Sequence, residues 1–376
     1  MRKLGLIVNP VAGIGGRVGL KGSDGAEIQK KALALGAVPR AQERAAQAVE
    51  RLKPVEDLEV ITYPGEMGEY AVTAGGLKAT IVGAIEPGQT TADDTKNAAR
   101  EMLHLGVDLL LFAGGDGTAR DICQAFAPLA AGGQMPPVLG IPAGVKIHSA
   151  VYARNPVAAG ELAALYLQGR VTSLREAEVM DIDEEAFRQG AVSARLYGYL
   201  QIPIRTSLVQ NLKMASIGGG GSVSAIAEDI VERMEDSCLY IIGPGTTTRA
   251  ITDELGLAKT LLGVDVVLDR RLVTMDANED QLLALVDSGQ GARIIVTPIG
   301  GQGYIFGRGN QQISSRVIER VGRDQIIVIS TPDKLHSLDR QPLLVDTGDP
   351  EIDEILSGYI TVVTGYHERA VRRVSA

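Results

Sequence analysis

The stretch "LLLFAGGDGTARDICQAF", residues 109–126, contains the transition that decides the fold of this chain. Five apolar residues, 109–113, lead directly into Gly114-Gly115-Asp116-Gly117-Thr118, and the residues after them predict a helix. An apolar run of this kind is typical of a strand buried on both faces in an α/β protein. A plain turn needs one or two glycines, so the third glycine and the carboxylate require a further explanation.

The composition indicates a globular chain with more than one core. It has 376 residues, 45% of them hydrophobic and 22% charged, and this length exceeds what one compact core organises. The net charge of −9 argues against a nucleic-acid partner, whose phosphates attract a basic face. A small phosphorylated ligand remains compatible, because a local lysine and a few backbone amides are enough to bind it.

Cysteine usage and the amino terminus predict a cytoplasmic protein. Cys123 and Cys238 lie far apart, and their spacing fits neither a disulfide framework nor a zinc site. The apolar run in "MRKLGLIVNP" (1–10) is too short for a signal peptide, and no run approaches the roughly 18 apolar residues of a membrane span. We therefore expect no membrane partner.

Residues 1–170 are predicted to form a Rossmann-type α/β domain that binds a nucleotide. Their strand and helix patterns alternate, which predicts a mostly parallel sheet with helices on both faces. The expected strands are 3–10, 57–64, 79–85, 107–115 and 136–144, and the expected helices are 26–36, 40–52, 91–106 and 118–129.

The pattern changes near residue 171. We predict a small β-rich unit over 171–221, ending in the four glycines Gly218–Gly221 as a hinge, and an α/β carboxyl-terminal domain over 222–376. In that domain the sequence predicts helices at 223–235, 247–257, 278–287 and 314–322, a single strand at 264–273, and a final strand followed by a helix or arm over 358–374.

Four glycine-rich segments follow predicted strands, at 9–25, 114–118, 141–146 and 243–248. Glycines allow the backbone to approach an anion closely, and a following helix adds free N–H groups and the positive end of its dipole. Each segment alone is equally explained by the bend that any strand-to-helix connection needs. The first three, however, would meet at one edge of one sheet, where ligands of such folds bind.

Asp116 is the unusual residue of the second segment. A carboxylate inside a phosphate-binding turn repels the ligand unless it has its own task, and two tasks fit. It can take a proton from an attacking hydroxyl, or it can hold Mg²⁺. The structural alternative is an Asx turn in which its side chain accepts from the amide of Thr118.

Other polar residues near these segments allow two interpretations. Lys146 can neutralise a phosphate, although such a lysine is often simply solvated. His148 can assist proton transfer, but a single histidine near a strand end is more often structural. Gly243, Gly245 and Thr246–Thr248 form either an anion site or an ordinary capped helix start. In the loop 299–312, Gln302, Arg308 and Asn310 can read ribose, base or phosphate groups, and the sequence leaves the role of this loop open.

These segments resemble a known superfamily. "GGDGT" after an apolar strand, "NPVAG" (9–13) after the first strand and "PVLGIPAGVK" (137–146) resemble the NAD kinase, diacylglycerol kinase and sphingosine kinase superfamily. With "GPGTTTRAI" (243–251) and "TPIGGQGYIFGRGNQQIS" (297–314), they resemble more closely the ATP-NAD kinase-like branch of acetoin-catabolism proteins such as AcoX.

The resemblance implies an ATP- or polyphosphate-dependent, Mg²⁺-assisted kinase that acts on NAD or a related nucleotide. Asp116 takes the position of the base or orienting group for the adenosine-ribose 2′-hydroxyl. The nucleotide-binding positions are then Asn9, Gly13, Gly114, Gly115, Gly117, Thr118, Gly144, Lys146, Gly243, Gly245, Thr246, Thr247 and Thr248. Relatives of this kind are usually homo-oligomers.

The chain also departs from the NAD kinase pattern. The Asn-Glu pair that grips the nucleotide in those kinases has no clear counterpart, since "ANED" (277–280) lies where a helix is predicted in a different region. Residues 223–330 read as α/β, whereas that domain is largely β in NAD kinases. Two alternatives therefore stay open: a non-catalytic NAD(H)- or ATP-binding accessory protein, and a kinase of another small hydroxyl compound.

Overall fold

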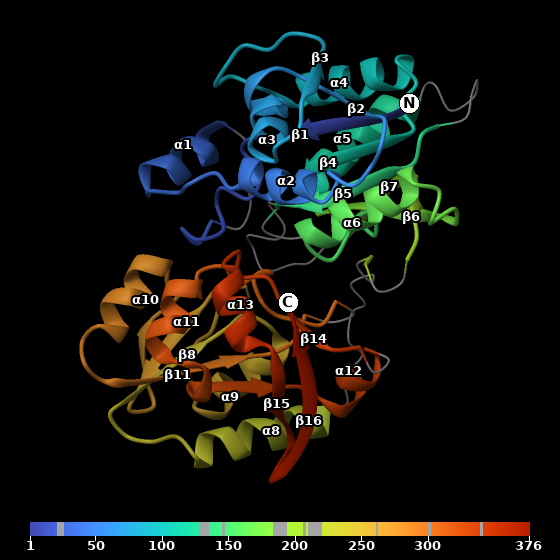
Figure 1. Cartoon of the computed structure of the whole chain (residues 1–376). Helices are drawn as coiled ribbons and strands as arrows, with labels where there is room; N and C mark the ends of the chain where they lie inside the picture. The colour runs from blue at the N-terminus through green and yellow to red at the C-terminus, as the bar shows by residue number, and fades with distance from the viewer. Residues whose placement is uncertain are drawn as a thin grey trace. The chain divides into compact units, whose positions relative to one another are not determined.

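The computed structural model describes residues 1–20, 26–127, 135–144, 147–182, 194–205, 208–209, 220–260, 262–299, 302–338 and 341–376 (Figure 1). The chain divides into two compact units. Unit 1 contains Met1–Ile14 and Gly22–Asn211, and unit 2 contains Gly15–Lys21 and Leu212–Ala376. The three-part division at residues 170 and 221 stays a prediction.

Unit 1 is built on a five-stranded parallel sheet in the order β3-β2-β1-β4-β5, as the alternating pattern predicts. The central strands are in close register, since Leu4 of β1 faces Val60 of β2 and Leu109 of β4. The strands are β1 (Arg2–Val8), β2 (Leu58–Thr62), β3 (Ala79–Ile81), β4 (Leu109–Gly114) and β5 (Val138–Pro142).

Helices cover both faces of this sheet (Figure 1). α2, α3 and α6 pack together on one face, and α4 and α5 pack together on the other. All six residues of β4 are consequently buried, which explains its uninterrupted apolar run. The helices are α1 (Ala26–Ala34), α2 (Ala41–Glu50), η1 (Gly65–Met67), α3 (Glu69–Ala74), α4 (Ala92–His104), α5 (Asp116–Phe126) and α6 (Pro156–Leu167).

The β-rich segment after residue 171 is an antiparallel pair, β6 (Leu174–Ile182) and β7 (Ala194–Pro203). Both strands pack against α5, so the pair belongs to unit 1. Residues 210–219 of the expected β-rich unit fall outside the described residues. They include Gly218 and Gly219 of the expected hinge, whereas Gly220 and Gly221 already belong to helix α8.

Unit 2 contains a nine-stranded mixed sheet in the order β10-β9-β8-β11-β13-β15-β16-β14-β12. Its centre, β8-β11-β13-β15, is parallel. The strands are β8 (Cys238–Ile242), β9 (Asp265–Leu268), β10 (Arg271–Thr274), β11 (Gly291–Val296), β12 (Tyr304–Phe306), β13 (Ile326–Ile329), β14 (Leu343–Val345), β15 (Gly358–Gly365) and β16 (Glu368–Ser375).

Alternate residues of β8 pack into two different cores. Leu239 and Ile241 belong to the core shared with α10 and α11, whereas Tyr240 and Ile242 belong to the core shared with α8 and α9. This alternation follows from the two-residue period of a strand. The helices are α8 (Gly220–Glu232), α9 (Thr246–Glu254), α10 (Glu279–Val286), α11 (Ser315–Val321), η3 (Arg323–Gln325), α12 (Pro332–His336) and α13 (Pro350–Leu356).

Two predictions about unit 2 are wrong for the same reason. The single strand expected at 264–273 is a hairpin, in which Asp269 and Arg270 turn the chain with φ of 50° and 59°. The expected terminal helix or arm is also a hairpin, β15–β16, whose turn places His367 at φ 58°. In both turns the residues in the left-handed region are not glycine, so the sequence does not mark those positions, although Gly365 begins the second turn.

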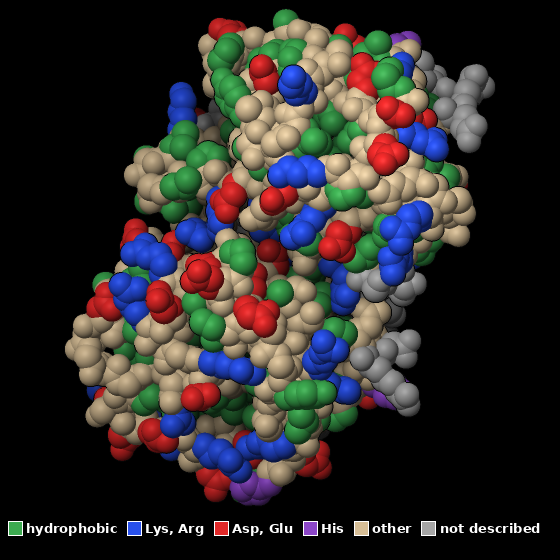
Figure 2. Space-filling model, viewed as in Figure 1, with side chains coloured by type: hydrophobic (Ala, Val, Ile, Leu, Met, Phe, Trp, Pro, Cys, Tyr) green, Lys and Arg blue, Asp and Glu red, His purple; other side chains and the backbone are tan. Residues whose placement is uncertain are grey.

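The surface mixes charges of both signs. Figure 2 shows acidic and basic side chains interspersed over the face in view. Among the helices that the structure describes, none has the length and apolar character needed to cross a membrane.

A buried ion network joins α8 to the β15–β16 turn. The fully buried carboxylate of Asp229 accepts hydrogen bonds from Arg369 Nη2 (2.7 Å) and His367 N (2.8 Å), and Arg233 lies 3.5 Å away. Burial alone would raise the pKa of Asp229, but the hydrogen bonds and positive charges outweigh it and lower the pKa. The network therefore stabilises the fold when Asp229 is ionised.

We expect Asp229→Asn to lower the free energy of unfolding at pH 7 by about 3 kcal/mol, because it removes one partner of a buried ion pair. Since folding lowers this pKa, the contribution is present above the unfolded value of 3.8 and disappears as the pH falls through the lower folded value. Urea unfolding of both proteins between pH 7 and pH 3 measures this difference. Asp253→Asn, at an exposed pair with Arg249, is the control and should cost at most about 0.5 kcal/mol. Equal losses in both variants would contradict the assignment.

Candidate functional site

Three of the predicted glycine segments meet at one edge of the unit 1 sheet. β1, β4 and β5 are parallel neighbours, with Val8 facing Ala113 and Gly114 facing Pro142. Their carboxyl ends therefore lie side by side, which is where ligands bind in open α/β sheets. The structure thus brings together Asn9, Gly13, Gly114–Thr118 and Gly144, while Lys146 lies outside the described residues.

The backbones of these segments touch one another. The amides of Ala143 and Gly144 both donate to Gly114 O, at 2.9 and 3.0 Å. A Cβ on Gly144 would lie 2.7 Å from Gly115 Cα, and one on Gly13, where φ is +75°, would collide with Ala143 O. Glycine is required at these positions because the segments pack backbone to backbone.

Asn9 and Thr118 hold the first segment against α5. Asn9 Nδ2 donates to Thr118 Oγ1 (3.0 Å), and Asn9 N donates to Ala113 O (2.9 Å). Thr118 N donates to the carbonyl of Gly115 (2.9 Å), so the alternative Asx turn from Asp116 to this amide is not formed. The side chains of Asn9 and Thr118 thereby fix the geometry of the edge.

Asp116 is the first residue of α5, and it is 7% exposed. Its Oδ2 accepts from His148 N (2.7 Å) and lies 3.2 Å from His148 Nδ1, while its Oδ1 accepts from Ser149 N (3.0 Å). The carboxylate is therefore turned toward the segment that follows β5. Sequence reasoning missed Ser149 and, for His148, favoured a structural role over assistance in proton transfer.

Tyr152 supports the glycine turn before Asp116. Its hydroxyl donates to Gly115 O (2.6 Å), and its ring packs edge-on against Phe112 of β4 with centroids 5.3 Å apart. The ring also fills the space beside Gly140 of β5. Tyr152 thus stabilises the turn through this hydrogen bond and the packing of its ring, a role that no local motif in the sequence indicates.

The site does not provide a ready-made cage for Mg²⁺. Across the described ranges, no group of three or more His, Cys, Asp or Glu side chains is arranged to hold a metal ion. Two backbone N–H groups and the ring nitrogen Nδ1 of His148 already face the oxygens of Asp116. Asp116 therefore does not fit the role of a metal ligand, and its geometry favours the other expected task, handling a hydroxyl proton.

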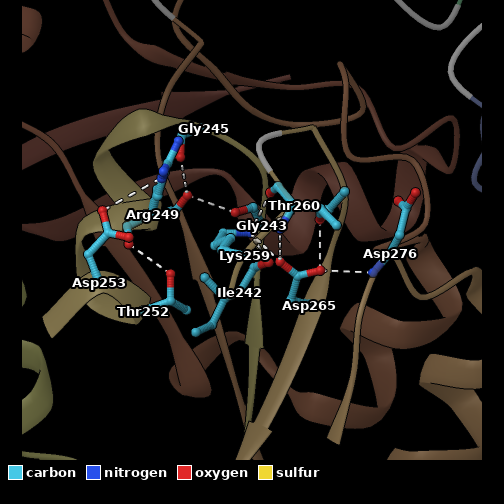
Figure 3. Close-up of polar contacts among 12 residues, drawn as sticks. Ile242, Gly243, Gly245, Arg249, Thr252, Asp253, Lys259, Thr260, Asp265 and Asp276 are labelled. Atoms are coloured by element: carbon cyan, nitrogen blue, oxygen red, sulfur yellow. Dashed lines mark hydrogen bonds and ion pairs between the residues drawn. The ribbon is translucent and has the colours of Figure 1, made fainter. Parts of the chain in front are cut away.

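The fourth glycine segment ends β8 in unit 2 (Figure 3). Gly245, at φ 129°, precedes α9, and Thr248 Oγ1 donates to Gly243 O (2.8 Å) and Gly245 O (2.9 Å). Thr247 and Thr248 are buried, whereas Thr246 is exposed at the helix start. The hydroxyl of Thr248 shapes the turn, and the role of this segment in nucleotide binding stays a prediction.

A buried ion pair lies beside this turn (Figure 3). Lys259 Nζ contacts Asp265 Oδ2 (3.1 Å) and Ile242 O (3.4 Å), and both side chains are fully buried. Asp265 also accepts from Thr260 N and Thr260 Oγ1 and from Asp276 N, at 2.7–2.8 Å. Burial lowers the pKa of Lys259, although the charge of Asp265 opposes this. The pair anchors the end of β8.

The polar residues of the loop 302–312 serve the interior of unit 2. Arg308 pairs with Asp346 (3.2 Å) and lies over the ring of Tyr304, and both Arg308 and Asp346 are buried. Asn310 Oδ1 accepts from Gly307 N (3.1 Å), and its Nδ2 donates to Ile305 O (2.8 Å). These contacts give Arg308 and Asn310 a structural role, and a role of this loop in reading a nucleotide stays open.

The fold and this edge define an α/β protein with a glycine-lined site at the start of a helix. Two sequence models agree with that class: the ATP-NAD kinase amino-terminal domain matches residues 4–171, and the ATP-NAD kinase carboxyl-terminal domain matches residues 235–374. Together they span most of the chain. The chain belongs to the ATP-NAD kinase family. The match to the carboxyl-terminal domain includes most of residues 223–330, the region whose α/β pattern departs from that of NAD kinases.

Solved structures give a distant likeness. A diacylglycerol kinase from Bacillus anthracis str. Sterne is 18% identical, with a TM-score of 0.24 over 48% of this chain and 46% of that chain. A candidate diacylglycerol kinase from the same strain is 19% identical, with a TM-score of 0.26 over 48% and 45%. The chain thus spans less than half of these relatives. Among curated proteins, no sequence matches it.

We expect Gly13→Ala to lower stability by about 1–3 kcal/mol more than Gly36→Ala. Both glycines have positive φ, 75° and 81°, so both variants carry the conformational cost of a left-handed alanine. Only at Gly13 does the new methyl group meet another segment, because Gly36 has no atom within 4 Å. Thermal unfolding of the two variants measures the difference. Equal shifts would mean that the segments separate easily.

Proposed function

We propose that this protein is a kinase that transfers a phosphoryl group from ATP or polyphosphate to a hydroxyl of NAD or a related nucleotide. Membership of the ATP-NAD kinase family supports this proposal. The observation that carries it is the placement of Asp116, a buried carboxylate at the first turn of α5, beside three backbone segments that converge on one sheet edge.

The geometry suits phosphoryl transfer, in which catalysis consists mainly of positioning and electrostatic stabilisation. The first turn of α5 presents the positive end of an 11-residue helix to the donor phosphates. Removal of the hydroxyl proton depends on Asp116. Mg²⁺ bound to the donor phosphates would neutralise part of their charge.

The nucleotide-binding set that we propose includes all the glycine segments. In unit 1 it comprises Asn9, Gly13, Gly114, Gly115, Gly117, Thr118, Gly144 and Lys146. In unit 2 it comprises Gly243, Gly245 and Thr246–Thr248. We place the chain in the acetoin-catabolism branch and expect a homo-oligomer in the cytoplasm, as its motifs imply.

The test is formation of NADP⁺ from NAD⁺ with Mg²⁺ and either ATP or polyphosphate, compared among the wild type, Asp116→Asn and Asp93→Asn. We expect Asp116→Asn to lower kcat at least about 100-fold, the usual minimum for losing proton transfer. Asp93 is an exposed aspartate in the first turn of α4, so Asp93→Asn controls for loss of charge and should retain full activity.

The other outcomes decide between the alternatives. Turnover with a sugar or polyol but not with NAD⁺ would replace the acceptor and keep the chemistry. Binding of NAD⁺ or ATP by calorimetry without any turnover would overturn the kinase proposal and favour the accessory role. Turnover that survives in Asp116→Asn would remove Asp116 from the reaction.

A further inference from the structure

A fully buried ammonium group lies at the carboxyl end of β8 (Figure 3). It belongs to Lys259, in the connection between α9 and β9. Four oxygens surround its Nζ: Asp265 Oδ2 at 3.1 Å, Thr260 O at 3.3 Å, and Ile242 O and Gly263 O at 3.4 Å. An ammonium has only three N–H donors, so its charge, rather than one hydrogen bond per oxygen, holds this shell together.

The shell joins the glycine turn after β8 to the α9–β9 connection. Ile242 is the last residue of β8 and directly precedes Gly243, whereas the other two carbonyls of the shell belong to the connection itself. One residue later, Gly243 N donates to Ile295 O of β11 (2.8 Å). The chain that enters the turn is thus held at two successive residues, by Lys259 and by β11.

We propose that Lys259 is a positioning residue for the turn Gly243–Gly245, and that its ammonium takes the place of a bound monovalent cation. This inference rests on the proposed function, which assigns the turn to nucleotide binding, and it adds a residue that acts through the turn. Without the positive charge, three carbonyl oxygens and a carboxylate would face one another in a buried site and repel. Relief of this repulsion would move the connection away from Ile242 O and alter the turn that follows.

The carboxylate of Asp265 has further donors besides the ammonium. It accepts hydrogen bonds from Thr260 N (2.8 Å), Thr260 Oγ1 (2.7 Å) and Asp276 N (2.8 Å). The connection is folded closely around this group, since a Cβ on Gly263 would lie 2.3 Å from Asp276 Oδ1 and 2.4 Å from Thr260 Oγ1. Lys259 adds the link from this connection to the carbonyl directly before the glycine turn.

Lys259→Met tests the proposal, because methionine follows the path of the aliphatic chain and leaves the place of Nζ empty. In choline chloride, whose cation is too large for the site, we expect a lower urea midpoint than in the wild type. The KM for one nucleotide, ATP or NAD⁺, should rise about tenfold, while kcat stays within about threefold. NH₄⁺ or K⁺ at the same concentration should raise the midpoint by at least about 0.5 M urea and return that KM toward the wild-type value.

Two further variants separate the shell from a general effect of salt or charge. Lys53→Met removes an exposed lysine that lies 3.7 Å from Glu50, so it should change neither KM nor the response to these cations. Lys259→Met/Asp265→Asn leaves no charge buried at the site. It should fold, keep the raised KM and show no response to NH₄⁺, because the neutral shell no longer attracts a cation.

The contrary results are as clear. Lys259→Met with wild-type KM for both nucleotides, or with the same cation response as Lys53→Met, would overturn the proposal. If Lys259→Met does not fold in any of the salts, the neutral double variant decides: wild-type KM values, or failure to fold, would also overturn it. A wild-type protein that phosphorylates no acceptor would instead overturn the proposed function, and the urea midpoints in the different salts would still test the cation site.

Discussion

The contact between the β4 and β5 turns is the constraint on which the candidate site depends. A single carbonyl, Gly114 O, accepts two amides from the other turn, and the adjoining Gly115 and Gly144 leave no room for a side chain. This contact brings the start of α5 within reach of the segment that follows β5. Asp116 can then bind two amides that lie 32 and 33 residues further along the chain. The geometry of the site is therefore a consequence of backbone packing.

Different interactions hold the carboxyl ends of the central strands in the two units. In unit 1 the edge is held by backbone hydrogen bonds between glycine turns, with Tyr152 beneath them. In unit 2 a fully buried Lys259–Asp265 pair holds the end of β8. A buried pair of charges tolerates the loss of neither partner, because the remaining charge has no water to solvate it. Backbone contacts instead restrict which residue types fit.

The features that can be predicted from the sequence are those determined by residues close together along the chain. The apolar run of β4 and the alternation of elements are enough to predict a parallel sheet with its glycine segments at one edge. Partners distant in the sequence escape such reasoning: Arg308 is paired with Asp346, and Asp116 with His148, by the fold alone. Turns without glycine escape it too, which is why the hairpin at Asp269 and Arg270 reads as one strand. Local patterns thus locate the site, and long-range contacts define its chemistry.

The two backbone amides that donate to Asp116 allow the site to be followed by hydrogen exchange. The N–H groups of His148 and Ser149 exchange with solvent when their hydrogen bonds to the carboxylate break. Their hydrogen-exchange rates therefore report how often these two hydrogen bonds open. A nucleotide that tightens the edge slows these two amides, and one that displaces the carboxylate speeds them. The backbone of this segment therefore carries a built-in probe of ligand binding, which needs neither a chromophore nor turnover.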